Sequence, residues 1–306
     1  MIGFVLRRLG YSLLSLALLS VTIFLLIRLT GDPTALLAEP GASEADLAEL
    51  RSKFGLDRPL PVQYAIFIGQ LLTGDLGQSF YYQTPVSELY FSRLPNSLLL
   101  AGTAMTFSLA VGIPSGVLAA MRLGGFWDTV GKMFTLVGLS MPSFWVGLVM
   151  ILVFTVWLGW LPSSGAGTYK HLIMPAFALG WYFAAAHMRL TRSSMLEVMG
   201  SEYVKLARLK GLPELWVIGK HAFKNALIPV ITLAGINLVV MINVAVVVET
   251  VFAWPGVGRL LYEGISFRDF PVVQGIVVIG GTMIVAVNLA VDILYAVIDP
   301  RIRVGS

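Results

Sequence analysis

Long uninterrupted apolar blocks are the feature that most constrains this 306-residue chain. The first, residues 9–27, contains no charged side chain, and about 20 helical residues cross a hydrocarbon core of about 30 Å. The chain is 57% hydrophobic and 12% charged, whereas a soluble domain carries about 25% charged residues. We therefore expect an all-α polytopic membrane protein with six transmembrane helices, at residues 9–27, 97–121, 132–158, 171–189, 227–251 and 272–298.

The distribution of basic residues predicts the orientation of these spans. Arg7 and Arg8 precede the first apolar block, which is too long for a signal peptide and lacks a small-residue cleavage site. With the N-terminus inside, thirteen of the 21 Lys and Arg residues fall in inner segments, and the short loops obey the positive-inside rule. Both termini are expected to be cytoplasmic.

The polar stretch between the first two spans predicts a small helical domain outside the membrane. Residues 44–54 have helical periodicity, and Ser43 is placed to cap that helix. The chain is thus divided into a first span at 1–30, an external domain at 31–95 and a core of five spans at 96–306. Within that core, residues 190–226 form a long basic cytoplasmic loop.

This loop has the pattern of two short amphipathic helices. Residues 202–210 place Tyr203, Leu206 and Ala207 on one helical face. Gly211 is expected to end this helix, and Pro213 suits the first turn of a second one that runs to about Asn225. Such a pair can transmit force if a partner packs on it, or can lie among lipid headgroups.

Several motifs in this chain resemble those of ABC importer permeases. Glu202, Ala207, Gly211 and the run 221–229 resemble the "EAA" loop of those proteins. The resemblance is closer to the first permease subunit of the dipeptide/oligopeptide/nickel transporter family and covers nearly the whole chain. Its further motifs are residues 54–59, 74–77, 141–145, 158–162, 190–195, 249–256 and 299–301.

The resemblance implies a type I ABC importer permease fold in a bacterial inner membrane. It also implies four kinds of partner: a second homologous permease, two P-loop ATPases that bind ATP and Mg, an extracytoplasmic binding protein and a peptide-like substrate. The residues that it assigns to ATPase coupling are Glu202, Tyr203, Ala207, Arg208, Lys210, Gly211, Leu212 and Pro213, with His221, Asn225 and Pro229 at the exit of the loop.

The chain itself lacks the sequence pattern of an ATPase. A phosphate-binding loop reads GxxxxGK[ST], and the nearest approach, Gly125 to Lys132, has one residue too many and continues with Met133. We therefore expect no catalytic residue and no cofactor on this chain. It has no cysteine and only three histidines, so no metal site is predicted, and nothing indicates nucleic acid.

Polar residues and a proline inside the spans are candidates for the transport pathway or its gate. They are Ser140, Pro142, Asn237, Asn243 and Glu249. Asn237 suits an interhelical hydrogen bond equally well, and Pro142 is a possible hinge. Glu249 is expected at the outer mouth, at the docked binding protein, or as a plain interfacial charge.

Three alternatives remain open. Ser140 within Gly138–Met141, together with His187, superficially resembles the dyad of an intramembrane serine protease. A channel is the second alternative, although no filter-like repeat is present. Within the importer interpretation, the substrate is a dipeptide, an oligopeptide, glutathione or a nickel complex. The lack of a His or Met cluster slightly favours peptides.

Overall fold

The computed structural model describes residues 2–29, 31–38 and 42–298, and this part of the chain is helical, without a strand. The motif expected at 299–301 lies outside the described residues. The chain divides into two compact units, one formed by residues 1–95 and 256–306 and the other by residues 96–255. Helix α5, Val86–Met121, passes from the first unit into the second.

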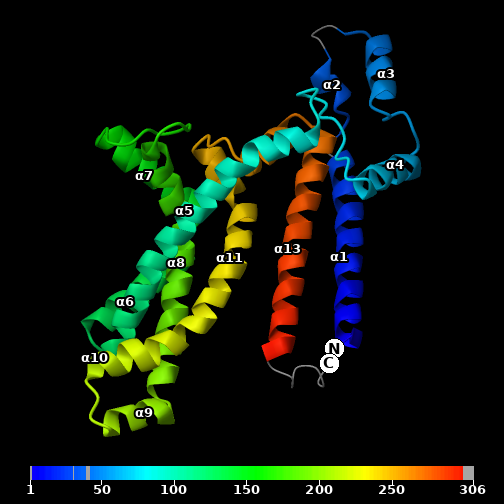
Figure 1. Ribbon diagram of the computed structural model, residues 1–306. Coiled ribbons are helices and arrows are strands. Elements are labelled where there is room, and N and C mark those ends of the chain that lie inside the picture. Colours follow the sequence, from blue (N-terminus) through cyan, green and yellow to red (C-terminus); the bar gives the residue numbers. More distant parts are fainter. Residues whose placement is uncertain (1, 30, 39–41, 299–306) are drawn as a thin grey trace. The chain divides into compact units, whose positions relative to one another are not determined.

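The first unit contains two long helices, α1 and α13, that lie side by side (Figure 1). Gly281 of α13 lies so close to Leu19 of α1 that a Cβ at this position would overlap the leucine side chain. Shorter helices complete the unit. Its elements are α1 (Ile2–Leu29), α2 (Thr34–Leu37), α3 (Glu44–Lys53), α4 (Leu60–Leu72), the start of α5, α12 (Val257–Ser266) and α13 (Phe270–Ile298).

The helix predicted at residues 44–54 is confirmed as α3, together with its cap. The Ser43 hydroxyl accepts a hydrogen bond from the Asp46 amide at 3.3 Å, and the Asp46 carboxylate accepts one from the Ser43 amide at 2.8 Å. This reciprocal capping box satisfies two amides that have no partner within the helix. Backbone hydrogen bonds from Ser43 therefore hold the pKa of Asp46 below its usual value.

A buried carboxylate joins the loop before α5 to the start of α13. Asp269 accepts hydrogen bonds from the Ser79 hydroxyl and from the amides of Phe80 and Tyr81. Asp269 is 1% exposed, and these three donors compensate the loss of water around its charge. The contact fixes a loop that is nearly 190 residues away in sequence from α13.

The second unit is built around α8. Small side chains let α5 approach it closely: a Cβ on Gly112 or Gly116 would lie 2.7 Å from the carbonyl oxygens of Ala184 or Met188. The elements of this unit are the rest of α5, α6 (Phe126–Ser140), α7 (Ser143–Met150), the π-helix η1 (Ile151–Trp157), α8 (Tyr169–Met199), α9 (Glu202–Leu209), α10 (Glu214–Trp216), the π-helix η2 (Val217–Phe223) and α11 (Lys224–Val251).

The predicted third span is broken at its proline. Helices α6 and α7–η1 meet at an angle of 100°, at Met141 and Pro142. Met141 is extended, at φ −88° and ψ 121°, because the residue before a proline avoids the helical region. The segment predicted as the third span, 132–158, is therefore bent at Pro142, the residue predicted as a possible hinge. Pro114 leaves α5 continuous.

The expected count of six spans is not confirmed. Among the described residues, four helices are long and apolar enough to cross a membrane, or five if the bent pair counts as one. The predicted fourth span, 171–189, lies within α8, which is not among these helices. Fourteen residues of α8 are buried in the second unit, where they form its core.

Candidate functional site

The predicted coupling segment forms a compact elbow, which we define as residues 200–216. Helix α8 extends to Met199, α9 occupies Glu202–Leu209, and Gly211 reverses the chain at φ +75°. A left-handed conformation favours glycine, and no atom lies within 4 Å of a Cβ built there. The predicted first helix and its glycine stop are therefore confirmed.

The predicted second helix is not a separate element. It starts after Pro213, as expected, but α10, η2 and α11 continue one another from Glu214 to Val251, over 38 residues. His221 and Asn225 therefore lie in the first turns of a long helix, and Pro229 lies inside α11. The loop predicted at 190–226 is short: residues 200–213 alone, α9 included, lie outside the two long helices.

One face of α9 is buried against its neighbours. Val204 and Ala207 pack with Val217 of η2 and with Val198 of α8. Ala207 was expected on the same face as Tyr203 and Leu206, but those two side chains are 44% and 52% exposed. The face in contact is shifted by one position, and sequence reasoning missed Val204, which is fully buried.

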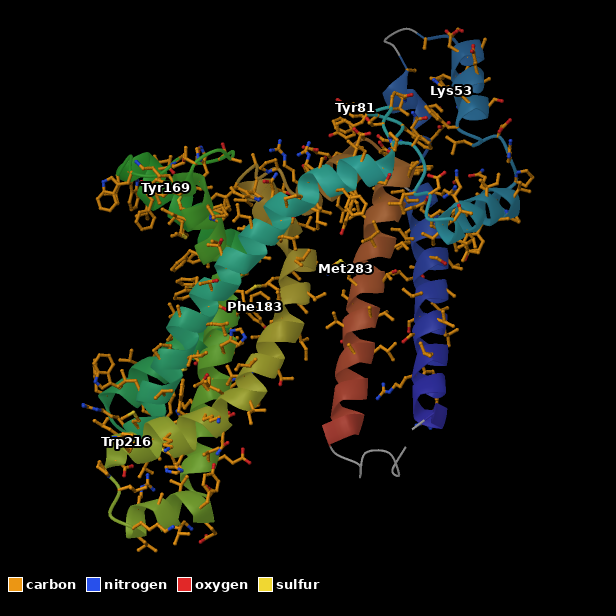
Figure 2. The ribbon with its side chains drawn as sticks, viewed as in Figure 1. Lys53, Tyr81, Tyr169, Phe183, Trp216 and Met283 are labelled. Atoms are coloured by element: carbon orange, nitrogen blue, oxygen red, sulfur yellow. The ribbon has the colours of Figure 1, made fainter. Side chains whose placement is uncertain are left out.

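The opposite side of the elbow exposes large apolar side chains. Trp216, at the end of α10, is 60% exposed (Figure 2), and Leu209 is 85% exposed. Lys220 lies 5.5 Å from the centre of the Trp216 ring. The exposed set, which we call the elbow face, is Tyr203, Leu206, Leu209, Leu212, Leu215 and Trp216.

Polar contacts brace the elbow across its turn. Arg208 pairs with Glu214 at 2.7 Å, on the far side of Gly211, and the hydrogen bond that Arg208 donates to Glu214 raises the pKa of Arg208. Asn225 donates to the Tyr203 hydroxyl at 2.9 Å, which joins an exit residue to α9. Both contacts are partly exposed and individually weak, but together they fix the angle between α9 and the helix that follows.

A buried carboxylate supports α8 just before the elbow. Asp128, at the start of α6, pairs with Arg192 of α8 at 2.6 Å and with Lys132 at 2.9 Å, and its side chain is fully buried. It also accepts from the Gly124 amide at 3.0 Å. Sequence reasoning missed this cluster. Its one signal is that Asp128 is the only acidic residue between Arg122 and Lys170.

The candidate pathway residues fall into separate environments. Asn237 lies 3.3 Å from Nε2 of His187, and Nδ1 of that ring lies 3.2 Å from the Ser108 hydroxyl. His187 is thus bonded to Ser108 and Asn237 and not to Ser140, so the protease dyad is not assembled. Ser140 instead lines a cavity of about 320 Å³ with Leu136, Leu139, Arg189 and Arg192.

The remaining two candidates on α11 are engaged in hydrogen bonds. Asn243 donates to the carbonyl of Val239 at 2.9 Å, within its own helix. Glu249 is 0% exposed and accepts a hydrogen bond from the Ser97 hydroxyl of α5 at 2.6 Å. Within this unit Glu249 thus joins α11 to α5, and its role in the pathway stays a prediction.

The sequence matches known proteins over almost its full length. Residues 112–304 match the family described as "Binding-protein-dependent transport system inner membrane component", and residues 1–101 match the N-terminal region of that component. The glutathione transport system permease protein GsiC of Salmonella choleraesuis is 40% identical, with 99% of each chain covered. A putative peptide permease protein of Brucella suis is 39% identical, covering 99% of this chain and 100% of the relative.

Solved structures agree at the level of the fold. An amino acid ABC transporter aligns with a TM-score of 0.51 over 68% of this chain and 93% of its own, at 16% identity. The MetNI methionine ABC transporter, in an inward-facing conformation, aligns with a TM-score of 0.55 over 70% of this chain and 97% of its own, at 18% identity. The chain therefore belongs to the binding-protein-dependent inner membrane components: it is a multi-pass permease subunit of an ABC importer, a family whose ATPase activity lies in separate subunits.

Proposed function

We propose that the elbow face is the surface on which an ATPase subunit drives this permease. The proposal rests on one observation: the elbow exposes large apolar side chains, and contacts within the chain hold the elbow in place. Six large apolar side chains are exposed on one short segment, although water disfavours such a patch on a free surface. The buried side of α9 and the Arg208–Glu214 pair keep this face in one orientation.

The proposed partners follow from the family. They are two P-loop ATPases that bind ATP and Mg on the cytoplasmic side, a second homologous permease and an extracytoplasmic substrate-binding protein. In this arrangement both termini and the elbow are cytoplasmic, and residues 31–95 lie on the outer side. Ser140, Pro142, Asn237, Asn243 and Glu249 are then candidates for helix movement or its transmission during alternating access.

A peptide-like compound is the proposed substrate. The relatives are named for glutathione and for peptides, and both kinds of compound contain peptide bonds. A permease for di- and oligopeptides or glutathione is therefore favoured over one for nickel complexes. The test uses the cognate binding protein and labelled dipeptide, glutathione and nickel in proteoliposomes, and uptake of nickel alone would overturn this substrate class.

A charge placed on the elbow face tests the coupling role. Leu209 touches little of its own chain, so Leu209→Asp is expected to leave the fold intact while it disrupts an apolar contact with a partner. In the reconstituted importer, we expect loss of ATP-driven uptake and loss of the stimulation of ATP hydrolysis by loaded binding protein. Leu209→Ile retains the apolar surface and is the matched control. Normal uptake by Leu209→Asp would contradict the assignment.

A further inference from the structure

Helix α4 has an unusual distribution of side chains for a segment outside a membrane. Its thirteen residues contain no charged side chain, and its buried residue is a glutamine, Gln63. Eight residues of α4 are exposed, and Gln70 is the one polar side chain among them. The large exposed side chains are Leu60, Val62, Ile66 and Leu72, at 51%, 43%, 39% and 83%. This distribution is opposite to that of a helix on a water-soluble domain.

The contacts of α4 fix its level along α1. Gln63 accepts hydrogen bonds from Arg28, one residue before the end of α1, at 2.9 and 3.0 Å. The Tyr64 hydroxyl lies 3.0 Å from the Ser20 hydroxyl, and the Tyr64 ring packs edge-on against Phe24 at 5.1 Å. Ser20 lies nine residues from Leu29, or about 13 Å along the helix axis. Half of a hydrocarbon core is about 15 Å thick, so α4 lies beside the part of α1 that spans it.

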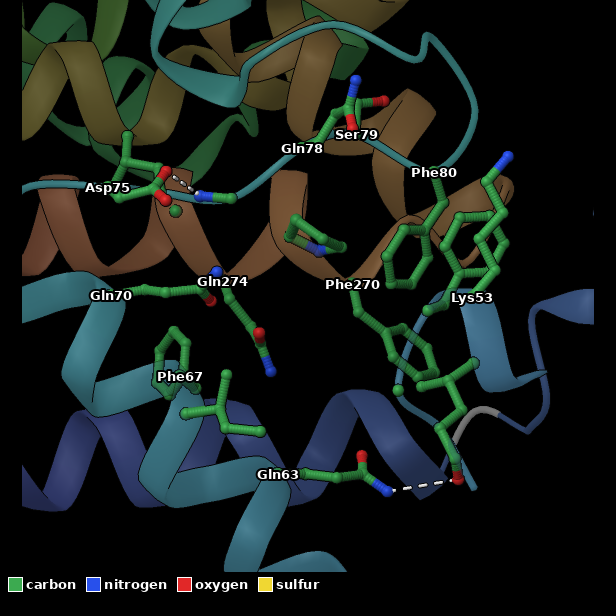
Figure 3. Close-up of a pocket in the computed structure, with 18 of the residues that line it drawn as sticks. Lys53, Gln63, Phe67, Gln70, Asp75, Gln78, Ser79, Phe80, Phe270 and Gln274 are labelled. Atoms are coloured by element: carbon green, nitrogen blue, oxygen red, sulfur yellow. Dashed lines mark hydrogen bonds between the residues drawn. The ribbon is translucent and has the colours of Figure 1, made fainter. Parts of the chain in front are cut away.

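The polar groups of α4 face inward, toward a cavity of about 440 Å³. Gln63 donates to the carbonyl oxygens of Leu56 and Arg58 on its edge. The amide of Gln274, from α13, projects into the space between Phe67, Gln63 and Phe270 (Figure 3). Gln274 is 5% exposed, and its Nε2 has no hydrogen-bond partner among the described residues. Both glutamines of α4, Gln63 and Gln70, therefore lie on the side that lines the cavity.

We propose that α4 is a lipid-facing helix, which lies against α1 at the level of the acyl chains near the Leu29 end. Helix α1, a candidate membrane span, likewise exposes apolar side chains, since Leu18, Leu25 and Leu26 are 59%, 48% and 54% exposed. Lipid accounts for all three observations: the absence of charge, the depth beside Ser20, and polar groups that face the cavity. The segment between α1 and α5 is then anchored in the membrane by α4, while α3 is in water.

The lack of cysteine in the chain makes a direct test possible. Single cysteines at Val62 and Ala65, two exposed residues of α4 that do not line the cavity, are spin-labelled in the complete importer, reconstituted in phospholipid vesicles. Leu14→Cys on the exposed side of α1 is the lipid reference, and Glu49→Cys on α3 is the water reference. The measurement is the collision rate of each label with oxygen, which concentrates in lipid, and with a water-soluble nickel chelate.

We expect the oxygen-to-nickel ratio at Val62 and Ala65 to equal that at Leu14 and to exceed that at Glu49 several-fold. A ratio at both α4 sites equal to that at Glu49 would overturn the proposal, because the helix would then be in water. Low collision rates with both reagents would overturn it as well, since a protein subunit would then cover α4. Retained uptake by each variant shows that the labelled importer is folded.

Discussion

Backbone conformation at a single residue determines the shape of the elbow. Gly211 has φ +75°, where a side chain costs about 1–2 kcal/mol even with free space around it. Gly219, eight residues later in η2, also has room for a Cβ, but its backbone is helical. The two glycines differ in conformation alone, so they separate backbone strain from crowding.

We predict that Gly211→Ala destabilises the protein by about 1 kcal/mol. Gly219→Ala should be neutral or stabilising by up to about 1 kcal/mol, because alanine favours helix. Thermal unfolding in detergent measures both, and hydrogen exchange of α9 shows whether the effect is local. Equal melting temperatures for the two variants would disprove the strain at Gly211.

Tyr82 gives a prediction for pH dependence. Its hydroxyl donates to Glu263 at 2.8 Å, and burial together with this bond raises the pKa of Tyr82 to about 12. Folding thus favours the protonated phenol, so its stabilising contribution is complete below about pH 10 and is lost as the pH rises through about 12. The absorbance titration of the native protein minus that of Tyr82→Phe should show one phenol with a midpoint near 12. A midpoint near 10 would contradict this contact.

Sequence patterns predicted the residues whose role is local. Ser43 and Gly211 end or begin helices through contacts within a few positions, and both were found where expected. The partners of His187 and Glu249 lie 50 to 152 residues away. Such bonds depend on how the helices pack, and one sequence does not contain that information. The polar residues of α11 could therefore be predicted as candidate functional residues, but their hydrogen-bond partners could not.

At the scale of elements, two helices meet through glycine. Gly112 and Gly116 are spaced i, i+4 on α5 and face the backbone of α8, the arrangement by which small residues let membrane helices approach. We predict that Gly112→Ala is destabilising by about 1–3 kcal/mol, because its Cβ would lie 2.7 Å from the Ala184 oxygen.

Gly102 on the same helix is the control for Gly112, since no atom lies within 4 Å of a Cβ there. Gly102→Ala should therefore retain the melting temperature of the native protein, and fluorescence-detected size-exclusion chromatography after heating compares the two. A native-like Gly112→Ala would show that α5 and α8 are not in close contact.

The elements differ in how well the sequence predicted them. Helices α3 and α9 carry clear start or stop residues and were predicted within one or two positions. Helix α8 continues ten residues past the end of the predicted span at Arg189, and on this extension Arg192 pairs with Asp128, a contact that a hydropathy pattern does not reveal. Pro142 bends its segment while Pro114 does not, and proline alone does not distinguish these outcomes.

At the scale of the whole molecule, the proposed orientation predicts labelling from opposite sides. In vesicles that carry the permease without its ATPase subunits, which would cover the elbow, Leu209→Cys should react with a membrane-impermeant maleimide only when the vesicles are inside-out. Ser52→Cys, at the end of α3, should react only in right-side-out vesicles, and the native chain, which has no cysteine, gives the background. Labelling of both variants from one side would exclude the orientation drawn from basic residues.

The proposed assembly predicts its composition. Native mass spectrometry of the importer purified through a tag on this chain should find one copy of the 33.2 kDa subunit with a second permease and two ATPases. The paired permeases complete a pathway of which this chain supplies half. An active complex with two copies of this chain would rule out the heteromeric proposal.

The unbroken helix from Glu214 to Val251 has a mechanical consequence. It is about 57 Å long, and no flexible joint separates its first turn at the elbow from its last. Bonds at Asn237 and Glu249 fasten this rod to α8 and α5. A displacement applied at Trp216 is therefore expected to tilt this helix and to move the parts of α8 and α5 that are bonded to it.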